Sequence, residues 1–306
     1  MPEGDTVART CQRLHHVFAG HTTQEAELRW GNREGNGLIG HTTIEVIPHG
    51  KHILHRFSNG WTLHSHLRME GSWRITHPNE PQRHSHRVRA LLSTNKWTAL
   101  GLSLGMLNLI PTRDEHTLTG HLGPDILGPD WNTDLATTNL LTNPTTIGAA
   151  LLDQRNLAGI GTLWASETLF TQHINPWTPT TTLTPQQITK ILTKAHQLMT
   201  AALNHAVQSS TGSHRPGHNT YVHARSGHPC RRCGTTIRVH PHRPTHPRTR
   251  HVLLSNMPKR PSTRRQRHPH QTPGLHPTPT PQRPPKNQVR KMTCPTSINP
   301  YPSPEP

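Results

Sequence analysis

The sequence predicts an α+β protein in which an N-terminal helix precedes an antiparallel β domain, a helical domain and an irregular C-terminal segment. Three observations support this prediction. Apolar residues recur at helical spacing in residues 5–20 and 184–206. Short alternating or β-branched runs, separated by turn residues, fill residues 24–110. Residues 240–306 contain 17 of the 30 prolines, which exclude a long helix there.

The first predicted helix covers residues 5–20. Asp5 suits its N-cap position, and Gly20 suits the left-handed position that follows its last turn. Its apolar face is formed by Val7, Cys11, Leu14, Val17 and Phe18.

The predicted β domain includes strands at 43–47 and 52–57, joined by a turn at Pro48-His49-Gly50. A connector follows at 120–135, and helical spacing returns in 144–172. The clearest helix covers 184–206, where Thr184 is expected as the N-cap, Pro185 as the first residue, and Gln187 as the partner in a capping box.

Composition narrows the class of protein. The formal net charge is +17, but residues 240–306 carry +11 of it and the rest of the chain only +6. A basic chain favours a polyanionic partner. No stretch reaches the ~18 apolar residues of a membrane-spanning helix, and the N-terminus has no apolar signal region, so we expect a cytoplasmic protein.

Of the four cysteines, Cys230 and Cys233 form a Cys-x-x-Cys, which favours metal or redox use over disulfides.

The first residues can carry covalent chemistry. If Met1 is removed, Pro2 presents a secondary amine with a pKa near ~8, part of which is unprotonated at neutral pH. Such an amine can attack an aldehydic sugar carbon and form an iminium, while Glu3 moves protons. The alternative is that Pro2 only directs removal of Met1 and that Glu3 is a solvated charge.

Three further segments have a functional and a purely structural interpretation. Lys51, after the turn glycine, could hold a phosphate or deliver a proton, or could only aid solubility. The segment Arg68-Met69-Glu70 could enter a duplex and fill the space of an extruded base, or Met69 could belong to a sheet core. The turn with Gly159 and Gly161 could aim N–H groups at a phosphate, or could be a close-packed helical hairpin.

Together, six motifs in this order resemble the bifunctional DNA glycosylases of the formamidopyrimidine-DNA glycosylase and endonuclease VIII family. The motifs are PEGD, HGK, HLRMEG, LGPDIL, DQRNLAGIG and TYVHARSGHPCRRCG, and the resemblance covers residues 2–238. It implies an antiparallel β-sandwich, a helix-two-turn-helix domain, a DNA cleft between them and a C-terminal zinc finger. The implied domains are 1–120, 121–215 and a partial finger at 216–239. The prolines and the lack of periodicity of residues 240–306 predict a disordered basic tail there.

The resemblance also implies residue roles. Pro2 becomes the Schiff-base nucleophile, Glu3 the proton donor and Lys51 the hairpin lysine of the cleavage steps. Arg68, Met69 and Glu70 fall on the void-filling loop, and Gly159, Gly161 and Thr162 on the DNA-binding turn. Thr162 stands where the family usually has Asn, which reduces the reach of that side chain.

The expected zinc finger is incomplete. Cys230 and Cys233 are present, but the family's second Cys-x-x-Cys is missing, and structural zinc needs four ligands. His246 and His251 match a two-Cys, two-His spacing, but Pro241, Pro244 and Pro247 exclude the helix that would carry them. Codons compatible with residues 248–259, read one nucleotide later, can encode Gly-Arg-Ala-Thr-Ser-Tyr-Cys-Pro-Thr-Cys-Gln. We therefore hypothesise a frameshift between about residues 234 and 247.

The resemblance therefore predicts a DNA repair glycosylase and lyase whose partner is damaged double-stranded DNA. We expect it to be a monomer that associates with the nucleoid and has no membrane partner. The HLRMEG segment slightly favours the endonuclease VIII branch, and therefore oxidised pyrimidines as the damaged bases. The resemblance also implies that the strand is cleaved by β,δ-elimination through a Schiff base on Pro2. The first alternative is an inactive or weak DNA-binding member of the family, because its finger is incomplete. The second is an adaptor whose Pro- and Arg-rich tail recognises partners.

Overall fold

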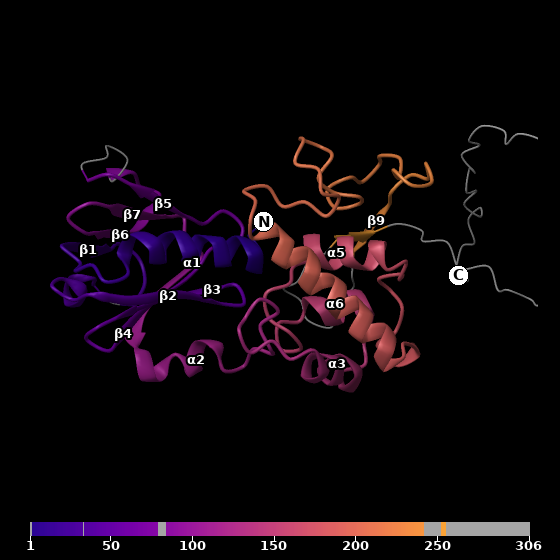
Figure 1. Cartoon of the computed structure of the whole chain (residues 1–306), viewed down its shortest axis with the longest axis horizontal. Coiled ribbons are helices and arrows are strands. Elements are labelled where there is room, and N and C mark those ends of the chain that lie inside the picture. The colour runs from indigo at the N-terminus through magenta and orange to yellow at the C-terminus, as the bar shows by residue number, and fades with distance from the viewer. Residues whose placement is uncertain (1, 33, 79–83, 242–251, 255–306) are drawn as a thin grey trace, which may run out of the picture.

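The computed structural model describes residues 2–32, 34–78, 84–241 and 252–254. Most of its β elements occupy one end of the molecule and its longer helices the other, with α1 alongside the strands and the late strand β9 at the helical end (Figure 1). The elements follow the predicted order, and the α+β prediction is confirmed.

The β part is a sandwich of two antiparallel four-stranded sheets, with strand orders β2-β3-β4-β8 and β1-β6-β7-β5. Buried apolar side chains of both sheets and of α1 share one core, which is the expected result when each strand places alternate residues inward. The helix and strands of this part are α1 (Gly4–Phe18), β1 (Glu25–Leu28), β2 (Thr43–His49), β3 (His52–Phe57), β4 (Trp61–His66), β5 (Ser72–Thr76), β6 (Val88–Ser93), β7 (Thr98–Leu102) and β8 (Met106–Pro111).

The start of α1 differs from the prediction. Glu3, and not Asp5, occupies the N-cap position, and Asp5 lies in the first turn, where Trp164 Nε1 donates to its carboxylate at 2.9 Å. The end agrees with the prediction, because Gly20 has a φ of +76° directly after the last turn. Asp5 thus bonds to Trp164, a residue remote in sequence, and does not cap the helix.

The first hairpin turn is also tighter than predicted. Strand β2 continues through Pro48 to His49, which pairs with His52, so the turn consists of Gly50 and Lys51 alone. Gly50 has a φ of +58°, which a two-residue hairpin requires and which glycine adopts without strain. This tight turn places Lys51 at the tip of a paired hairpin.

The helical part follows a connector that begins earlier than predicted, covers residues 112–132 and crosses the outer face of the β2-β3-β4-β8 sheet. Glu115 of the connector accepts hydrogen bonds from Arg56 at 2.6 and 2.9 Å and from Thr62 at 2.6 Å. The connector and helices are η3 (Thr112–Asp114), α2 (His116–Thr119), α3 (Thr133–Thr142), α4 (Ile147–Leu152), α5 (Thr162–Thr171), η4 (Thr180–Thr182) and α6 (Pro185–Ala202), while η1 (Asn36–Leu38) lies in the first domain.

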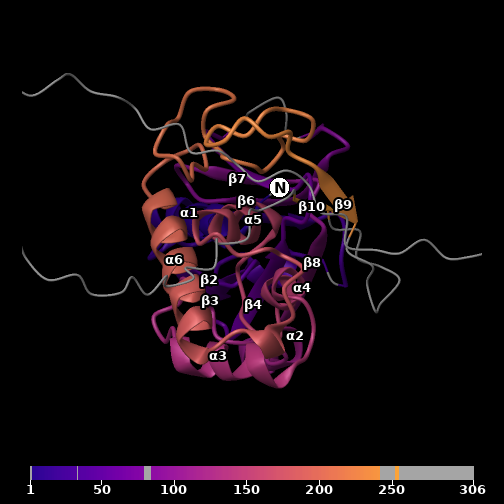
Figure 2. The ribbon, with the colours of Figure 1, turned by 90° about the vertical axis from the view of Figure 1, so that its right-hand side faces the viewer.

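Helix α6 confirms its predicted start, with Thr184 and Gln187 forming a capping box and Pro185 in the first turn. Its apolar stripe and α5 enclose a second core around the fully buried Trp164. Figure 2 shows α5 beside the upper part of α6, with strands of the β part behind both. The two cores meet where the start of α1 contacts the start of α5, through Asp5 and Trp164.

Most of the predicted tail lies outside the described residues, including His246 and His251. Its described residues belong to β9 (Val239–Pro241) and β10 (Val252–Leu254), which pair antiparallel. For these few residues the prediction of irregular chain was wrong, because backbone pairing formed despite the prolines. Within the described residues, no helix is long and apolar enough to cross a membrane.

Candidate active site

Four segments that are distant in sequence meet where the two cores join. The N–H of Gly4 donates to the carbonyl of Gly159 at 2.8 Å, which attaches the N-terminal segment to the predicted glycine turn. The N–H of Gly50 donates to Asp125 Oδ2 at 2.8 Å, which attaches the hairpin tip to the connector. The connector itself pairs with the glycine turn, since the N–H of Ile126 donates to Ala158 at 3.1 Å. Backbone contacts thus bring Pro2, Glu3 and Lys51 to one place.

Glu3 is fully buried and ties the N-terminus to helix α5. Its Oε2 accepts the N–H of Gly161 at 2.8 Å and that of Trp164 at 3.3 Å, and its Oε1 accepts that of Leu163 at 2.8 Å. These are the N–H groups that the first turn of a helix leaves without a partner, and they carry a partial positive charge. The carboxyl group therefore lies in a defined orientation at the start of α5.

The environment of Glu3 tunes its acidity. Burial raises the pKa of Glu3 from 4.5 to about 7, while the charge of Lys51 and the backbone N–H groups oppose that rise. A carboxyl group with this pKa is protonated in a large fraction of molecules at neutral pH, which suits a general acid. The alternative of a solvated surface charge for Glu3 does not fit this buried position.

Lys51 lies half-buried at the hairpin tip, close enough to Glu3 for each group to shift the pKa of the other. Burial lowers the pKa of Lys51, and the Glu3 charge raises it in part. A Cβ atom on Gly50 would lie 2.8 Å from Ala158 Cβ, so the tip packs directly on the glycine turn. This packing gives Lys51 a more constrained place than a surface hairpin lysine has.

Pro2 is half-buried and immediately precedes Glu3, so its nitrogen lies one residue from the buried carboxyl group. Met1 lies outside the described residues. The arrangement can therefore supply an amine, a proton donor and a second amine within one junction. This combination suits attack on an electrophilic carbon followed by proton transfer.

The predicted void-filling loop is a protruding turn between β4 and β5. Met69 is 67% exposed, which excludes the sheet-core alternative, and Arg68 adopts a φ of +51°. His66 Nδ1 accepts the N–H of Arg68 at 2.9 Å, and the N–H of Gly71 donates to Leu67 at 2.9 Å, closing the turn. An apolar side chain is thus presented to solvent on a fixed loop.

The two glycine N–H groups of the predicted turn have partners within the chain. The N–H of Gly161 donates to Glu3, and the N–H of Gly159 donates to Gln154 Oε1 at 3.1 Å, which favours the close-packed alternative for these two groups. The glycines instead permit close packing: a Cβ on Gly161 would lie 2.4 Å from the Glu3 carboxyl carbon. Thr162, the first residue of α5, remains half-buried next to this turn.

The structure adds two positioning residues that sequence reasoning did not assign. Asp125, whose Oδ1 also accepts the N–H of Leu127 at 3.1 Å, fixes the lysine hairpin. Glu167 is fully buried in α5 and accepts the N–H groups of residues 221–223 at 2.7–2.8 Å. Asp125 lies in the LGPDIL motif, which was the available signal, whereas Glu167 has no local signal because its partners are 54–56 residues away.

Cys230 and Cys233 lie on a turn of the kind that can begin a zinc site. The N–H of Gly234 donates to the Cys230 carbonyl, and the N–H of Cys230 to the Thr235 carbonyl, both at 2.8 Å. Within the described part of the chain, however, no group of three or more His, Cys, Asp or Glu side chains could hold a metal ion. The described residues supply two ligands where a closed zinc site needs four, so they do not fit the metal.

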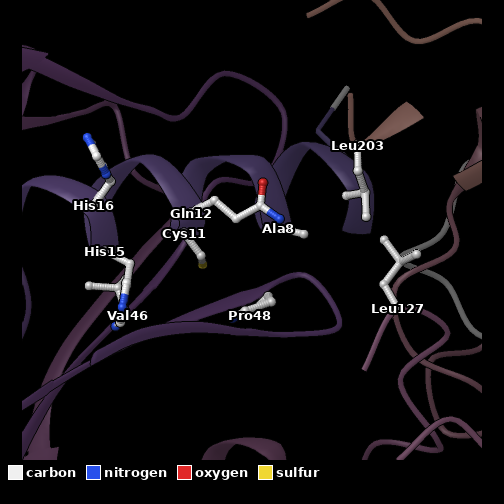
Figure 3. Close-up of a pocket in the computed structure, with 9 residues that line it drawn as sticks. All are labelled: Ala8, Cys11, Gln12, His15, His16, Val46, Pro48, Leu127 and Leu203. Carbon is white, nitrogen blue, oxygen red and sulfur yellow. The ribbon is translucent and has the colours of Figure 1, made fainter. Parts of the chain in front are cut away.

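A cavity of about 400 Å³ lies beside α1, between β2 and residues Leu127 and Leu203 (Figure 3). None of the predicted catalytic residues lines it. Its lining consists of Ala8, Cys11, Gln12, His15, His16, Val46, Pro48, Leu127 and Leu203. The cavity is therefore separate from the junction that holds Glu3 and Lys51.

Comparison with known proteins gives matches over most of the chain. Two family models match: the formamidopyrimidine-DNA glycosylase N-terminal domain at residues 1–100 and the formamidopyrimidine-DNA glycosylase H2TH domain at residues 122–213. A probable endonuclease 8 2 of Streptomyces coelicolor is 42% identical over 244 residues, covering 78% of this chain and 87% of the relative. A Mycolicibacterium smegmatis protein named DNA-(apurinic or apyrimidinic site) lyase Nei2 is 36% identical, over 78% of this chain and 93% of its own.

Solved structures agree on the fold. The formamidopyrimidine DNA glycosylase of Lactococcus lactis, non-covalently bound to DNA containing an abasic site, superposes with a TM-score of 0.69 at 20% identity. The superposition covers 83% of this chain and 97% of that chain. The predicted β-sandwich and helix-two-turn-helix architecture is thereby confirmed.

Proposed function

The chain belongs to the formamidopyrimidine-DNA glycosylase and endonuclease VIII family, and from this premise we propose that Pro2 is its nucleophile and Glu3 its proton donor. The protein is a DNA glycosylase with abasic-site lyase activity, and it acts on DNA in base-excision repair. The observation that supports these residue roles is the buried Glu3 carboxyl group, with a pKa of about 7, between Pro2 and Lys51.

The proposed reaction begins when the Pro2 nitrogen attacks C1′ of the damaged nucleotide. The bond from C1′ to the base breaks, and its electron pair leaves with the base, which takes up the proton that the Pro2 nitrogen loses. Opening of the sugar ring forms the iminium, and the ring oxygen needs a proton that Glu3 can supply. Because Glu3 is held by three N–H groups, its proton is delivered from one defined position.

Lys51 is proposed to assist the eliminations that cleave the strand. Its lowered pKa leaves more neutral amine at pH 7 than an exposed lysine has, which favours proton transfer. The exposed Met69, with Arg68 and Glu70 beside it, is proposed to fill the duplex after base extrusion. Thr162 is proposed to contact the DNA backbone through its hydroxyl group.

We propose oxidised pyrimidines as the favoured lesions and a monomer as the acting species on damaged duplex DNA. The first proposal rests on the HLRMEG segment, and the relatives named endonuclease 8 support it. The rival function within the family is weak or inactive DNA binding. Its specific support is that the described residues offer Cys230 and Cys233 without further zinc ligands.

Borohydride trapping tests the nucleophile directly. An iminium is reducible and a simple ionic complex is not, so the wild type should become covalently linked to duplex DNA that contains an abasic site. Pro2→Gly keeps an amine but loses the secondary amine, and trapping should fall sharply. Unchanged trapping of this variant would assign the chemistry to another amine, and absence of trapping by the wild type would favour the DNA-binding alternative.

A further inference from the structure

Three polar side chains form a hydrogen-bonded chain on the outer face of the β2-β3-β4-β8 sheet, beginning next to Lys51, and a fourth, His66, contacts it. His52 follows Lys51 in β3, and its Nδ1 lies 2.7 Å from Nε2 of His64 in β4. His64 Nδ1 lies 3.1 Å from Asn108 Nδ2 in β8. His52 also stands edge-on to His66, with ring centroids 5.0 Å apart. The mechanism proposed above uses neither His52, His64 nor Asn108.

The protonation states in this chain follow from its contacts. Burial lowers the pKa of His52 to about 3 and those of His64 and His66 to about 4, so all three rings are neutral at pH 7. Each neutral ring carries one N–H group and one lone pair. The direction of hydrogen bonding along the chain then decides which nitrogen carries the proton.

Asn108 sets that direction. Its Nδ2 is a donor, so Nδ1 of His64 must accept and the His64 proton must lie on Nε2. His64 then donates to Nδ1 of His52, and the His52 proton must lie on Nε2. Because His64 is fully buried, its two ring nitrogens have no contact with bulk water that could replace Asn108 or His52 as hydrogen-bond partners.

The arrangement excludes a cation and favours an anionic acceptor. The lone pairs of His64, His52 and His66 accept hydrogen bonds from Asn108, His64 and the Arg68 N–H, respectively, so none can bind a metal. The His52 Nε2–H has no acceptor among the described residues, and His52 is half-buried, so this group can meet a ligand. Lys51 lies directly before it in the chain.

The charged groups around the cluster add to this preference. Lys51 and Arg68 act on His66 as positive neighbours. His49 and His121 are further titratable neighbours of His52. The acidic neighbour is Glu115, which faces His64 and is neutralised by Arg56 at 2.6 Å. A negatively charged acceptor beside Lys51 is therefore favoured over a neutral one.

We propose that His52 donates its Nε2–H to a backbone phosphate of the DNA strand next to Lys51, and that His64 and Asn108 are positioning residues that fix the required tautomer. The proposal rests on the proposed function, because it takes DNA as the ligand. It adds a phosphate contact from a neutral residue, whose donor does not depend on pH near neutrality. Hydrogen bonds to a charged group are worth enough to change affinity about tenfold or more.

The first test measures the dissociation constant of the full-length protein for duplex DNA carrying a tetrahydrofuran abasic-site analogue. His52→Phe keeps the ring that stacks on His64 and removes the donor, so binding should weaken about tenfold. His52→Gln retains an N–H donor and should remain within about threefold of the wild type. Equal affinity of the wild type and His52→Phe would overturn the proposal.

The second test reverses the direction of the hydrogen bonds that run from Asn108 through His64 to His52, which we call the relay. Asn108→Asp replaces the donor with an acceptor, so a His64 ring that stays neutral must protonate Nδ1, and His52 must then donate from Nδ1 and lose its Nε2–H. Nitrogen NMR of the imidazoles should show this exchange of tautomer, and affinity should fall about tenfold. In the His52→Gln background, Asn108→Asp should have little effect, because an amide donor has no tautomer. An equal loss in both backgrounds would show that the added charge acts alone and would refute the relay.

The ligand is identified by replacing single phosphates near the analogue with neutral methylphosphonates. One position should weaken the wild type about tenfold and leave His52→Phe unchanged. If no position distinguishes the two proteins, the His52 partner is not a phosphate. Borohydride trapping of the wild type, measured in parallel, reports the proposed function separately: a protein that traps normally but shows no His52 dependence contradicts only this inference.

Discussion

Replacement of Glu3 by Gln is the sharpest test of the proposed chemistry, because the two side chains have nearly the same shape. The variant cannot donate or accept the catalytic proton. Loss of a general acid or base typically slows a reaction by about 10²- to 10⁴-fold. We expect base excision to fall by such a factor, while binding to duplex DNA persists.

The same change has a structural cost that can be derived from the contacts. Glu3 accepts from Gly161 and Trp164 at one oxygen and from Leu163 at the other, but Gln has a single acceptor oxygen. At least one buried N–H group therefore loses its partner, at a cost of about 1–3 kcal/mol. For a chain of this size that corresponds to a drop in Tm of roughly 3–10 °C.

The pH dependence separates the catalytic and structural effects. The folded state holds the Glu3 proton more tightly than the unfolded chain, since the pKa rises from 4.5 to about 7. The resulting stabilisation is complete below pH 4.5 and is lost as the pH rises through 7, a change of about 3 kcal/mol. Gln cannot titrate, so the stability deficit of the variant should shrink by about that amount between pH 4.5 and 7.5.

The assay is single-turnover excision from duplex DNA with an oxidised pyrimidine, from pH 5 to 9, with urea unfolding at the same pH values. Glu167→Gln is the matched control, since Glu167 is also fully buried and also accepts three backbone N–H bonds. The control should lose comparable stability and keep the wild-type pH profile of excision. A Glu3→Gln variant that keeps both the wild-type rate and the wild-type profile would refute the assignment of Glu3.

Three further predictions concern the lysine hairpin and the finger. Lys51→Gln should slow strand cleavage while leaving borohydride trapping largely intact, as judged by separating the cleaved DNA ends on gels; equal loss of both would reject its separate role. Gly50→Ala should lower Tm and slow cleavage, because its Cβ would lie 2.8 Å from that of Ala158 at a φ of +58°; an unchanged melting curve would contradict this packing. The purified chain should hold well under one zinc by mass spectrometry, and restoring the one-nucleotide shift should raise both zinc content and incision; stoichiometric zinc in the sequence as given would defeat the frameshift hypothesis.

Local patterns were sufficient for much of the fold. Helix α6 begins where Thr184, Pro185 and Gln187 predict, because capping and the proline preference act within one turn. The β2-β3 hairpin follows from β-branched runs and a turn glycine for the same reason. The glycine turn was also visible, and of its two interpretations the contacts of Gly159 and Gly161 favour close packing.

The sequence by itself also determined the chemical capacity of the site, since Pro2, Glu3 and Lys51 are recognisable by residue type and motif. Only the tertiary structure decided that Glu3 lies at the start of α5, some 160 residues along the chain, and that Asp125 holds the hairpin. Capping and turn preferences depend on neighbours in sequence, whereas desolvation and the field of a helix terminus depend on what folding brings close in space. The local sequence around Glu3 is compatible with a carboxylate on the surface and with a buried acid. The contacts of Glu3 with the start of α5 make it a buried acid with a pKa of about 7.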